Sequence, residues 1–408
     1  MLEKDLKINS SSKTNNFLYF IIKILILEDY LSVTELKKQV NLNELEYLFS
    51  EVNLSKLYQI IKVQKLAVLI NKSIFLKENM PSSFNKTIEN FTSVPRKKCL
   101  ESMALICVIY KILKNKGIEV LFFKGPILSI QTTGSIFSRG FSKDIDILVK
   151  YKDFIRVIKI LFKKGFKVKK NSEIFIKNDL LGWYSRKVVN QVTLFKDFSN
   201  QTLHIDLHWE LSFIRNKLPS QESIFNNKDF VSFNNIEIPT LNKKNALIHT
   251  YIHNGIDDWN KIRGIIDFFR LIVINDEAFI RELRNDKLFI DSCLYSYFLL
   301  DLPQINKIIQ KNLKPSFKKP YINKFNSKDL SEIKLISKSK WSFKKRYIII
   351  KRHLKLTNNL GEMIRILLNN LFPPKDFWSN SSQRFYFIHE IIIFRIKKLY
   401  MRLLNEYK

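Results

Sequence analysis

The stretch from residue 121 to residue 149, LFFKGPILSIQTTGSIFSRGFSKDIDILV, constrains the fold of this chain most. A short apolar run leads into Lys124-Gly125-Pro126, and an apolar pattern with helical spacing follows it. A second apolar run begins at Asp144-Ile145-Asp146. Short apolar runs on either side of a helical pattern predict a strand, a helix and a second strand. We therefore expect this stretch to form the centre of a domain that combines strands and helices.

The second strand carries two acids, Asp144 and Asp146, which alternate with apolar residues. Residues two apart on a strand point to the same face, so Ile145 points to the other face, toward a core. Two neighbouring carboxylates repel each other unless a cation lies between them. We interpret the pair as a metal site facing a phosphate-binding loop at Lys124-Gly125. The alternatives are a solvated strand edge with two surface acids, and a surface lysine at a turn.

Composition indicates a globular and mostly helical protein. Of the 408 residues, 46% are hydrophobic, and only nine Gly and ten Pro interrupt the chain. Such a length predicts about two or three domains. The formal net charge of +31 is typical of proteins that bind nucleic acid, nucleotides or anionic membranes. The lysines are spread over every segment, however, which favours a general compositional bias over one binding surface.

The cysteines and the N-terminal sequence bear on the cellular compartment. Cys99, Cys107 and Cys293 show no paired spacing, which indicates a reducing compartment without a disulfide framework. Cys99 and Cys107 lie on an apolar helical pattern and are predicted to be buried thiols. The first residues lack a signal-peptide pattern, and the apolar run at 17–27 contains Lys23 and is too short to span a bilayer. We expect a soluble, cytoplasmic protein without a membrane span.

The N-terminal part is predicted to be helical. Residues 17–76 show helical spacing of apolar residues, and Ser32 or Thr34 is suited to cap a helix. One long helix is expected over 91–116, ended by Gly117 in a left-handed conformation. The expected buried stripe of this helix is Leu100, Met103, Ala104, Cys107, Tyr110 and Leu113.

A helix over 151–163 and a hairpin are expected after the first two strands. The hairpin consists of a strand over 187–195, a turn over 196–201 and a returning strand over 202–209. The returning strand alternates cleanly, with Asp206 in the middle of its polar face. The apolar face comprises Leu203, Ile205, Leu207 and Trp209, and the polar face comprises His204, Asp206, His208 and Glu210.

The C-terminal half is again predicted to be helical over 243–274, followed by a Pro- and Lys-rich linker at 314–326. Two basic amphipathic helices are expected around 341–356 and 385–404, and they present either a surface for RNA or an acidic partner, or a solvated face. We divide the chain into a helical N-terminal region (1–95), an α/β core (96–240), a helical domain (241–313), and a linker with basic C-terminal helices (314–408).

Several short motifs follow one another in an order that resembles the uncharacterised nucleotidyltransferase family of the DNA polymerase β-like superfamily. The motifs are Lys124-Gly125, Arg139, Asp144-Ile145-Asp146-Ile147-Leu148-Val149, Asp206-Leu207-His208-Trp209, the helix residues His249, His253 and Asp267, and Phe372-Pro373-Pro374. The resemblance implies an α+β fold, in which a small mixed β-sheet forms the nucleotidyltransferase core and helical regions flank it on both sides.

The resemblance also implies an activity. Such an enzyme transfers a nucleoside monophosphate from a nucleoside triphosphate (NTP) to a hydroxyl group, with pyrophosphate leaving, and it depends on Mg²⁺ or Mn²⁺. The acceptor stays open between a small molecule, a protein and an RNA, and so does the oligomeric state. The implied catalytic and metal-binding residues are Asp144, Asp146 and Asp206, and the implied phosphate-binding residues are Lys124, Gly125, Arg139 and Ser142.

The chain departs from the superfamily pattern at two places. Gly-Ser is usual where Lys124-Gly125 stands, and a serine usually precedes the first acid directly, where this chain has Lys143 after Ser142. Two other functions also stay open: a non-catalytic scaffold or binding protein of the same fold, and an RNA- or tRNA-binding protein that uses the basic surface.

The two histidines of the 243–274 region, His249 and His253, lie four residues apart, as two zinc ligands on a helix would. No cysteine or other third ligand stands nearby, so we favour packing or substrate contacts for them. Asp267 is interpreted as a packing or capping acid.

Overall fold

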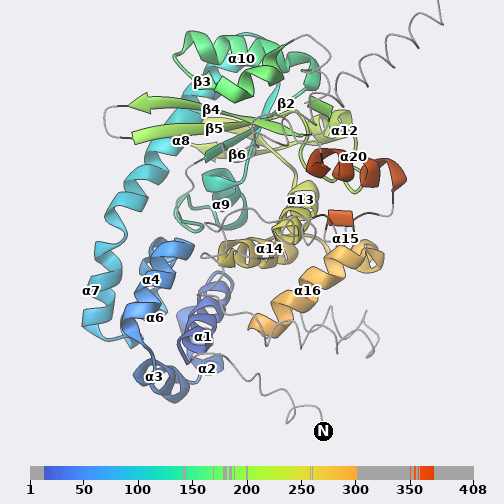
Figure 1. The fold of residues 1–408 in the computed structure, drawn as a ribbon. Coiled ribbons are helices and arrows are strands. Elements are labelled where there is room, and N and C mark those ends of the chain that lie inside the picture. Colours follow the sequence, from blue (N-terminus) through green and yellow to red (C-terminus); the bar gives the residue numbers. More distant parts are fainter. Residues whose placement is uncertain are drawn as a thin grey trace, which may run out of the picture. The chain divides into compact units, whose positions relative to one another are not determined.

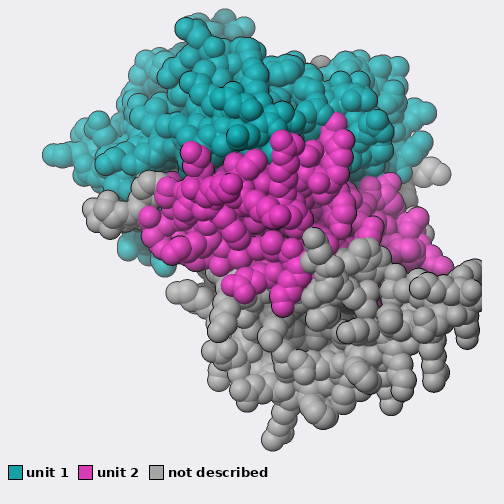
Figure 2. All heavy atoms as spheres, turned by 90° about the horizontal axis from the view of Figure 1, so that it is seen from above, with its two compact units in different colours: residues 1–146, 217–340 teal, residues 147–216, 341–408 magenta. Residues whose placement is uncertain are grey.

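The computed structural model of the protein describes residues 13–140, 144–168, 170–177, 182, 186–187, 189–198, 201–257, 259, 261–300, 350, 353–354, 357 and 359–371. The chain forms two compact units: unit 1 contains residues 1–146 and 217–340, and unit 2 contains residues 147–216 and 341–408 (Figure 2). Ser142, the linker at 314–326, Phe372-Pro373-Pro374 and nearly all of the two basic helices lie outside the described residues.

Seven helices open unit 1 among its described residues: α1 (Lys13–Leu27), α2 (Val33–Gln39), α3 (Leu42–Ser50), α4 (Leu54–Gln64), α5 (Ala67–Lys72), α6 (Ile74–Asn79) and α7 (Ser82–Asn90). The predicted cap is confirmed, because Ser32 accepts a hydrogen bond from the Glu35 amide and the Glu35 carboxylate accepts one from the Ser32 amide. Helix α1 is buried on most of its surface, and Phe17, Leu18 and Ile21 are fully buried.

The long helix α8 (Ser93–Lys114) runs from α7 to the first strand (Figure 1). Its end is confirmed, because Gly117 has φ +66° and the Ile118 amide bonds the Leu113 carbonyl. The expected buried stripe is wrong in phase: Leu100 is exposed, although Met103 and Leu113 are buried. Because α8 carries apolar residues on several faces, periodicity alone did not identify the face that is buried. The stripe that the structure buries is Cys99, Ser102, Met103, Ile106, Ile109 and Leu113.

Five strands form one sheet in the order β1-β2-β5-β4-β3. They are β1 (Val120–Phe123), β2 (Asp144–Val149), β3 (Lys167–Val168), β4 (Gln191–Phe198) and β5 (Gln201–His208). Strands β3, β4 and β5 pair in antiparallel fashion. A separate hairpin consists of β6 (Asp229–Phe233) and β7 (Ile236–Thr240). The predicted α+β class with a small mixed sheet and flanking helices is confirmed.

The hairpin of β4 and β5 is longer than expected. Lys196 pairs with Leu203 and Phe198 pairs with Gln201, so most of the region predicted as a turn belongs to the strands. Asp197, one of the polar residues that suggested a turn, pairs across the strands instead, since the Thr202 hydroxyl donates to Asp197 Oδ1 over 2.7 Å.

Unit 2 packs its own core around Trp209. The ring of this residue lies 4.6 Å from that of Phe154, and its indole nitrogen donates to the Arg186 carbonyl. Among the described residues of unit 2, the remaining elements are η1 (Tyr151–Asp153), α10 (Phe154–Lys163), η2 (Lys170–Ile176) and α20 (Leu360–Leu371). Strand β5 keeps the predicted apolar face, and His208 on the predicted polar face is buried as well.

Unit 1 continues with α9 (Gly125–Thr133) after β1, and later with α12 (Gln221–Asn226), α13 (Lys243–Ile256), α14 (Ile262–Ile274), α15 (Glu277–Glu282), η3 (Leu283–Asn285) and α16 (Lys287–Leu300). Helices α1, α13, α14 and α16 pack together (Figure 1). The Asn254 side chain donates to the Gly264 carbonyl, and a Cβ at Gly264 would meet Asn254, so α13 and α14 cross closely there. Among the helices that the structure describes, none is long and apolar enough to cross a bilayer.

Candidate functional site

The turn between β1 and α9 has an unusual backbone. Lys124 adopts φ +59° and ψ −162°, a conformation that residues with a side chain rarely hold, and Gly125 follows with φ +46°. Pro126, whose fixed φ suits the first turn of a helix, then starts α9. Backbone strain of this kind persists only where the surroundings hold it in place, and it is common at ligand-binding sites.

The Lys124 side chain pairs with Asp146. Its ammonium lies 3.2 Å from Asp146 Oδ1, and the two side chains are only 16% and 8% exposed. An unpaired carboxylate would be costly at this depth, so the ammonium stabilises the charged acid. Asp144 begins the same strand and is half-buried. The Lys124 side chain therefore points toward Asp146, one of the two predicted acids of β2, rather than to solvent.

A second ion pair holds the loop after α9. Arg139 Nε lies 2.5 Å from Oδ2 of Asp267, which is buried on α14. The residue before it, Ser138, accepts a hydrogen bond from Lys72 Nζ over 2.8 Å, and its carbonyl accepts one from Arg270. Asp267 thus acts as the packing acid that we expected, and it orients Arg139.

The rings of Phe123, His249 and His253 contact one another in a row next to Lys124. His249 is buried against the ring of Phe123 at 5.2 Å, and His253 stacks on His249 at 5.7 Å with an interplanar angle of 11°. The Lys124 ammonium is the largest cause that holds the pKa of His253 well below its ordinary value, and burial adds to it. His253 is therefore a neutral imidazole near pH 7.

The third predicted acid belongs to the other unit. Asp206 lies on β5 in unit 2, and its Oδ1 accepts a hydrogen bond from Thr193 over 2.6 Å. Asp144 and Asp146 lie in unit 1. In the described part of the chain, no three His, Cys, Asp or Glu side chains form a group that could hold a metal ion. Asp144 and Asp146 supply the oxygen donors that Mg²⁺ and Mn²⁺ prefer, and the buried Asp146 already faces a cation.

Comparison with known families places these residues in context. A family model described as an uncharacterised nucleotidyltransferase matches residues 50–288. The chain belongs to this family. None of the curated proteins matches it. The matched range includes α13 and α14, so the helices that carry His253 and Asp267 are part of the region that defines the nucleotidyltransferase family.

Sequence reasoning missed one charged residue near these acids. Burial and the nearby Arg139 lower the pKa of the Arg263 guanidinium to about 10, while the charges of Asp267 and Asp144 raise it. Arg263 therefore lies in the same cluster as the first predicted acid. A signal was present, because Arg263 precedes Asp267 by four residues, the spacing that brings opposite charges together on a helix.

Proposed function

We propose that this protein transfers a nucleoside monophosphate from an NTP to a hydroxyl of an acceptor, as an Mg²⁺- or Mn²⁺-dependent enzyme of the DNA polymerase β-like superfamily. The observation that carries the proposal is the buried Lys124–Asp146 pair at the start of α9, in a chain of a nucleotidyltransferase family. A small molecule, a protein and an RNA are the candidate acceptors. A cytoplasmic location stays a prediction.

The chemistry of this transfer matches the charges of the cluster. Negative charge develops on the phosphoryl oxygens, so cations placed beforehand lower the barrier. Lys124, Arg139 and Arg263 supply such cations in unit 1. Helix α9 begins at Gly125, and the amides of its first turn provide donors for phosphate oxygens, except at Pro126, which has no N–H.

The metal would be held by carboxylates. Asp144, Asp146 and Asp206 are the proposed ligands, and Asp206 would come from β5 of unit 2. A bound Mg²⁺ supplies positive charge to the phosphoryl group and the leaving pyrophosphate. Lys124 orients Asp146, and Asp267 orients Arg139.

Calorimetry with an NTP and Mg²⁺ tests the proposal. Asp146→Asn removes one charge from the buried pair with little change in size, so we expect NTP binding to weaken at least about tenfold, the effect of losing a contact to a charged group. The matched control is Asp197→Asn, an exposed acid on β4, which should bind like the wild type. Equal binding by Asp146→Asn and the wild type, or no binding by either, would favour the non-catalytic scaffold.

A further inference from the structure

A pocket in unit 1 lies between the N-terminal helices and α8. Its volume is about 250 Å³, which is below the roughly 300–1,000 Å³ of sites for drug-sized ligands. It is therefore too small for a nucleoside triphosphate and suits a single ring or a short chain. Its walls come from α4, α5, the end of α7 and the first turns of α8. The lining residues are Ile61, Lys62, Lys65, Ala67, Val68, Phe91, Val94, Pro95 and Lys98.

The pocket combines an apolar wall with cationic side chains. Ile61, Ala67 and Val68 are buried and form its apolar floor. Among the described residues that line it, every charged side chain is a lysine. Lysines occur throughout this chain, so their presence at the pocket does not by itself indicate a binding site. Here, however, the lysines surround a concave apolar surface that carries no carboxylate, and this combination favours a ligand that is both apolar and anionic.

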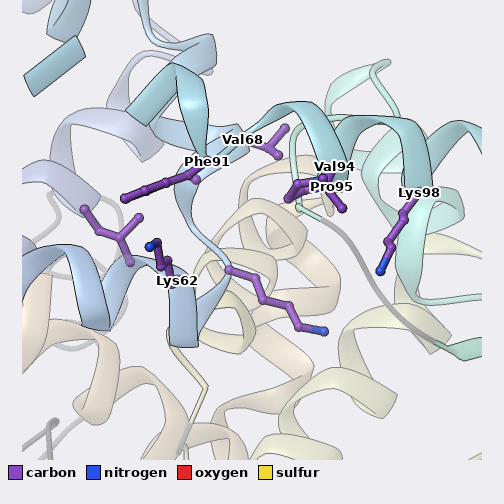
Figure 3. A pocket seen from close by; sticks show the side chains of 9 residues that line it. Lys62, Val68, Phe91, Val94, Pro95 and Lys98 are labelled. Carbon is purple, nitrogen blue, oxygen red and sulfur yellow. The ribbon is translucent and has the colours of Figure 1, made fainter. Parts of the chain in front are cut away.

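The Lys62 ammonium is held at the pocket by an aromatic ring. It lies 4.0 Å from the centroid of Phe91 (Figure 3). A cation–π contact of this kind positions the ammonium without neutralising its charge. Lys62 therefore remains able to pair with an anionic group of a ligand whose apolar part rests on the floor.

The corner between α4 and α5 gives the pocket a fixed shape. Lys65 has φ +58° and ends α4, and its amide bonds the Ile61 and Lys62 carbonyls. Its own carbonyl packs so closely on Gly140 that a Cβ there would lie 2.5 Å away. A site that is formed before binding loses little entropy on binding.

We propose that this pocket binds a small molecule with an apolar body, such as one ring, and one anionic group, either a carboxylate or a phosphate. The apolar body fills the space between Val68 and Pro95, and Lys62 pairs with the anionic group. None of the residues that line this pocket belongs to the proposed catalytic, metal-binding or phosphate-binding set, and the inference does not depend on the proposed transfer reaction.

Ligand-observed NMR titrations of the full chain test the ligand class. The probes are phenylacetate and phenyl phosphate, the neutral phenylacetamide, and acetate and inorganic phosphate, which lack the apolar body. We expect saturable binding of one or both aromatic anions, and binding at least about tenfold weaker for every other probe. The stronger of the two anions identifies the preferred group. Equal binding of phenylacetamide, or no saturable binding of either aromatic anion, overturns the proposal.

Two variants test the location. Val94→Trp fills the pocket mouth from a position that is 60% exposed, so the core stays intact, and it should abolish binding. Its control is Val108→Trp, at a position 52% exposed on the same helix and outside the pocket. Lys62→Gln should weaken binding of the anion at least about threefold, whereas Lys97→Gln, on α8 and outside the pocket, should not. If Val94→Trp and Lys62→Gln both bind like the wild type, the pocket is not the site.

Discussion

Lys124 combines two features that are each uncommon, a left-handed φ and a buried ammonium. A glycine would hold this backbone without strain, but it would leave the buried Asp146 without the cation that it now contacts. A lysine at this position therefore has a physical reason, since its side chain supplies a charge that glycine does not carry. The same ammonium acts on the neighbouring His253, which it keeps neutral.

The protein should lose stability in mild acid because of His253. In the unfolded chain this residue titrates near its ordinary pKa of 6.5, whereas in the folded protein its pKa lies well below that value. Below about pH 6.5 the unfolded state therefore binds more protons, and the free energy of unfolding falls with falling pH. Between about pH 7 and pH 5.5 we therefore expect His253→Gln to lose less stability than the wild type.

Urea denaturation at a series of pH values measures this difference. His204→Gln, on β5 of unit 2, serves as a control for the replacement of a histidine elsewhere in the fold. Lys124→Met should reduce the slope, because Lys124 is the largest cause of the shift. Identical slopes for the wild type and His253→Gln would contradict the proposed environment of the imidazole.

At the scale of elements, the loop after α9 is held on several sides. Ser138 bonds to Lys72 on α5 and to Arg270 on α14, and Arg139 pairs with Asp267. Gly140 then lies against the Lys65 carbonyl at the end of α4. The helical N-terminal part thus does more than flank the sheet, because it positions the loop that carries a proposed phosphate-binding arginine.

Replacement of two glycines separates backbone strain from this close contact. Gly134 and Gly140 both have a positive φ, +71° and +74°, so alanine is strained at either position. Only Gly140 has a backbone atom in the way, whereas a Cβ at Gly134 meets nothing within 4 Å. Gly140→Ala should be less stable than Gly134→Ala by about 1–3 kcal/mol, the usual cost of overpacking. Thermal unfolding of the two variants measures this, and equal stabilities would contradict the tight loop.

For the whole molecule, local patterns predicted most elements but not the contacts between them. The capping box at Ser32 and the helix end at Gly117 follow from neighbouring residues, and both are confirmed. The Lys124–Asp146 pair joins positions 22 residues apart, and the Arg139–Asp267 pair joins positions 128 apart. Periodicity contains no information on such pairs. It also failed for α8, where tertiary packing decides which face is covered.

The choice of acceptor depends on the whole molecule, and the transfer of a radioactive label from an NTP can identify the class of the acceptor. With an NTP labelled at the α-phosphate, nucleotidyl transfer leaves the label on the acceptor, whereas a γ-label departs with pyrophosphate. We expect the wild type with Mg²⁺ and cell extract to transfer α-label but not γ-label. Asp146→Asn should transfer at least about tenfold less, since it lacks a proposed metal-binding charge.

Nuclease and protease treatment of the labelled product then separates RNA, protein and small-molecule acceptors. Label that is lost with ribonuclease would make RNA the acceptor and would give the basic composition a role in substrate binding, because phosphate contacts dominate the affinity for nucleic acids. In that case transfer should also fall steeply with added salt, whereas transfer to a small molecule should depend on salt only weakly. Transfer of γ-label instead of α-label would mean phosphoryl transfer, and the proposed reaction would be wrong although the chain binds nucleotides.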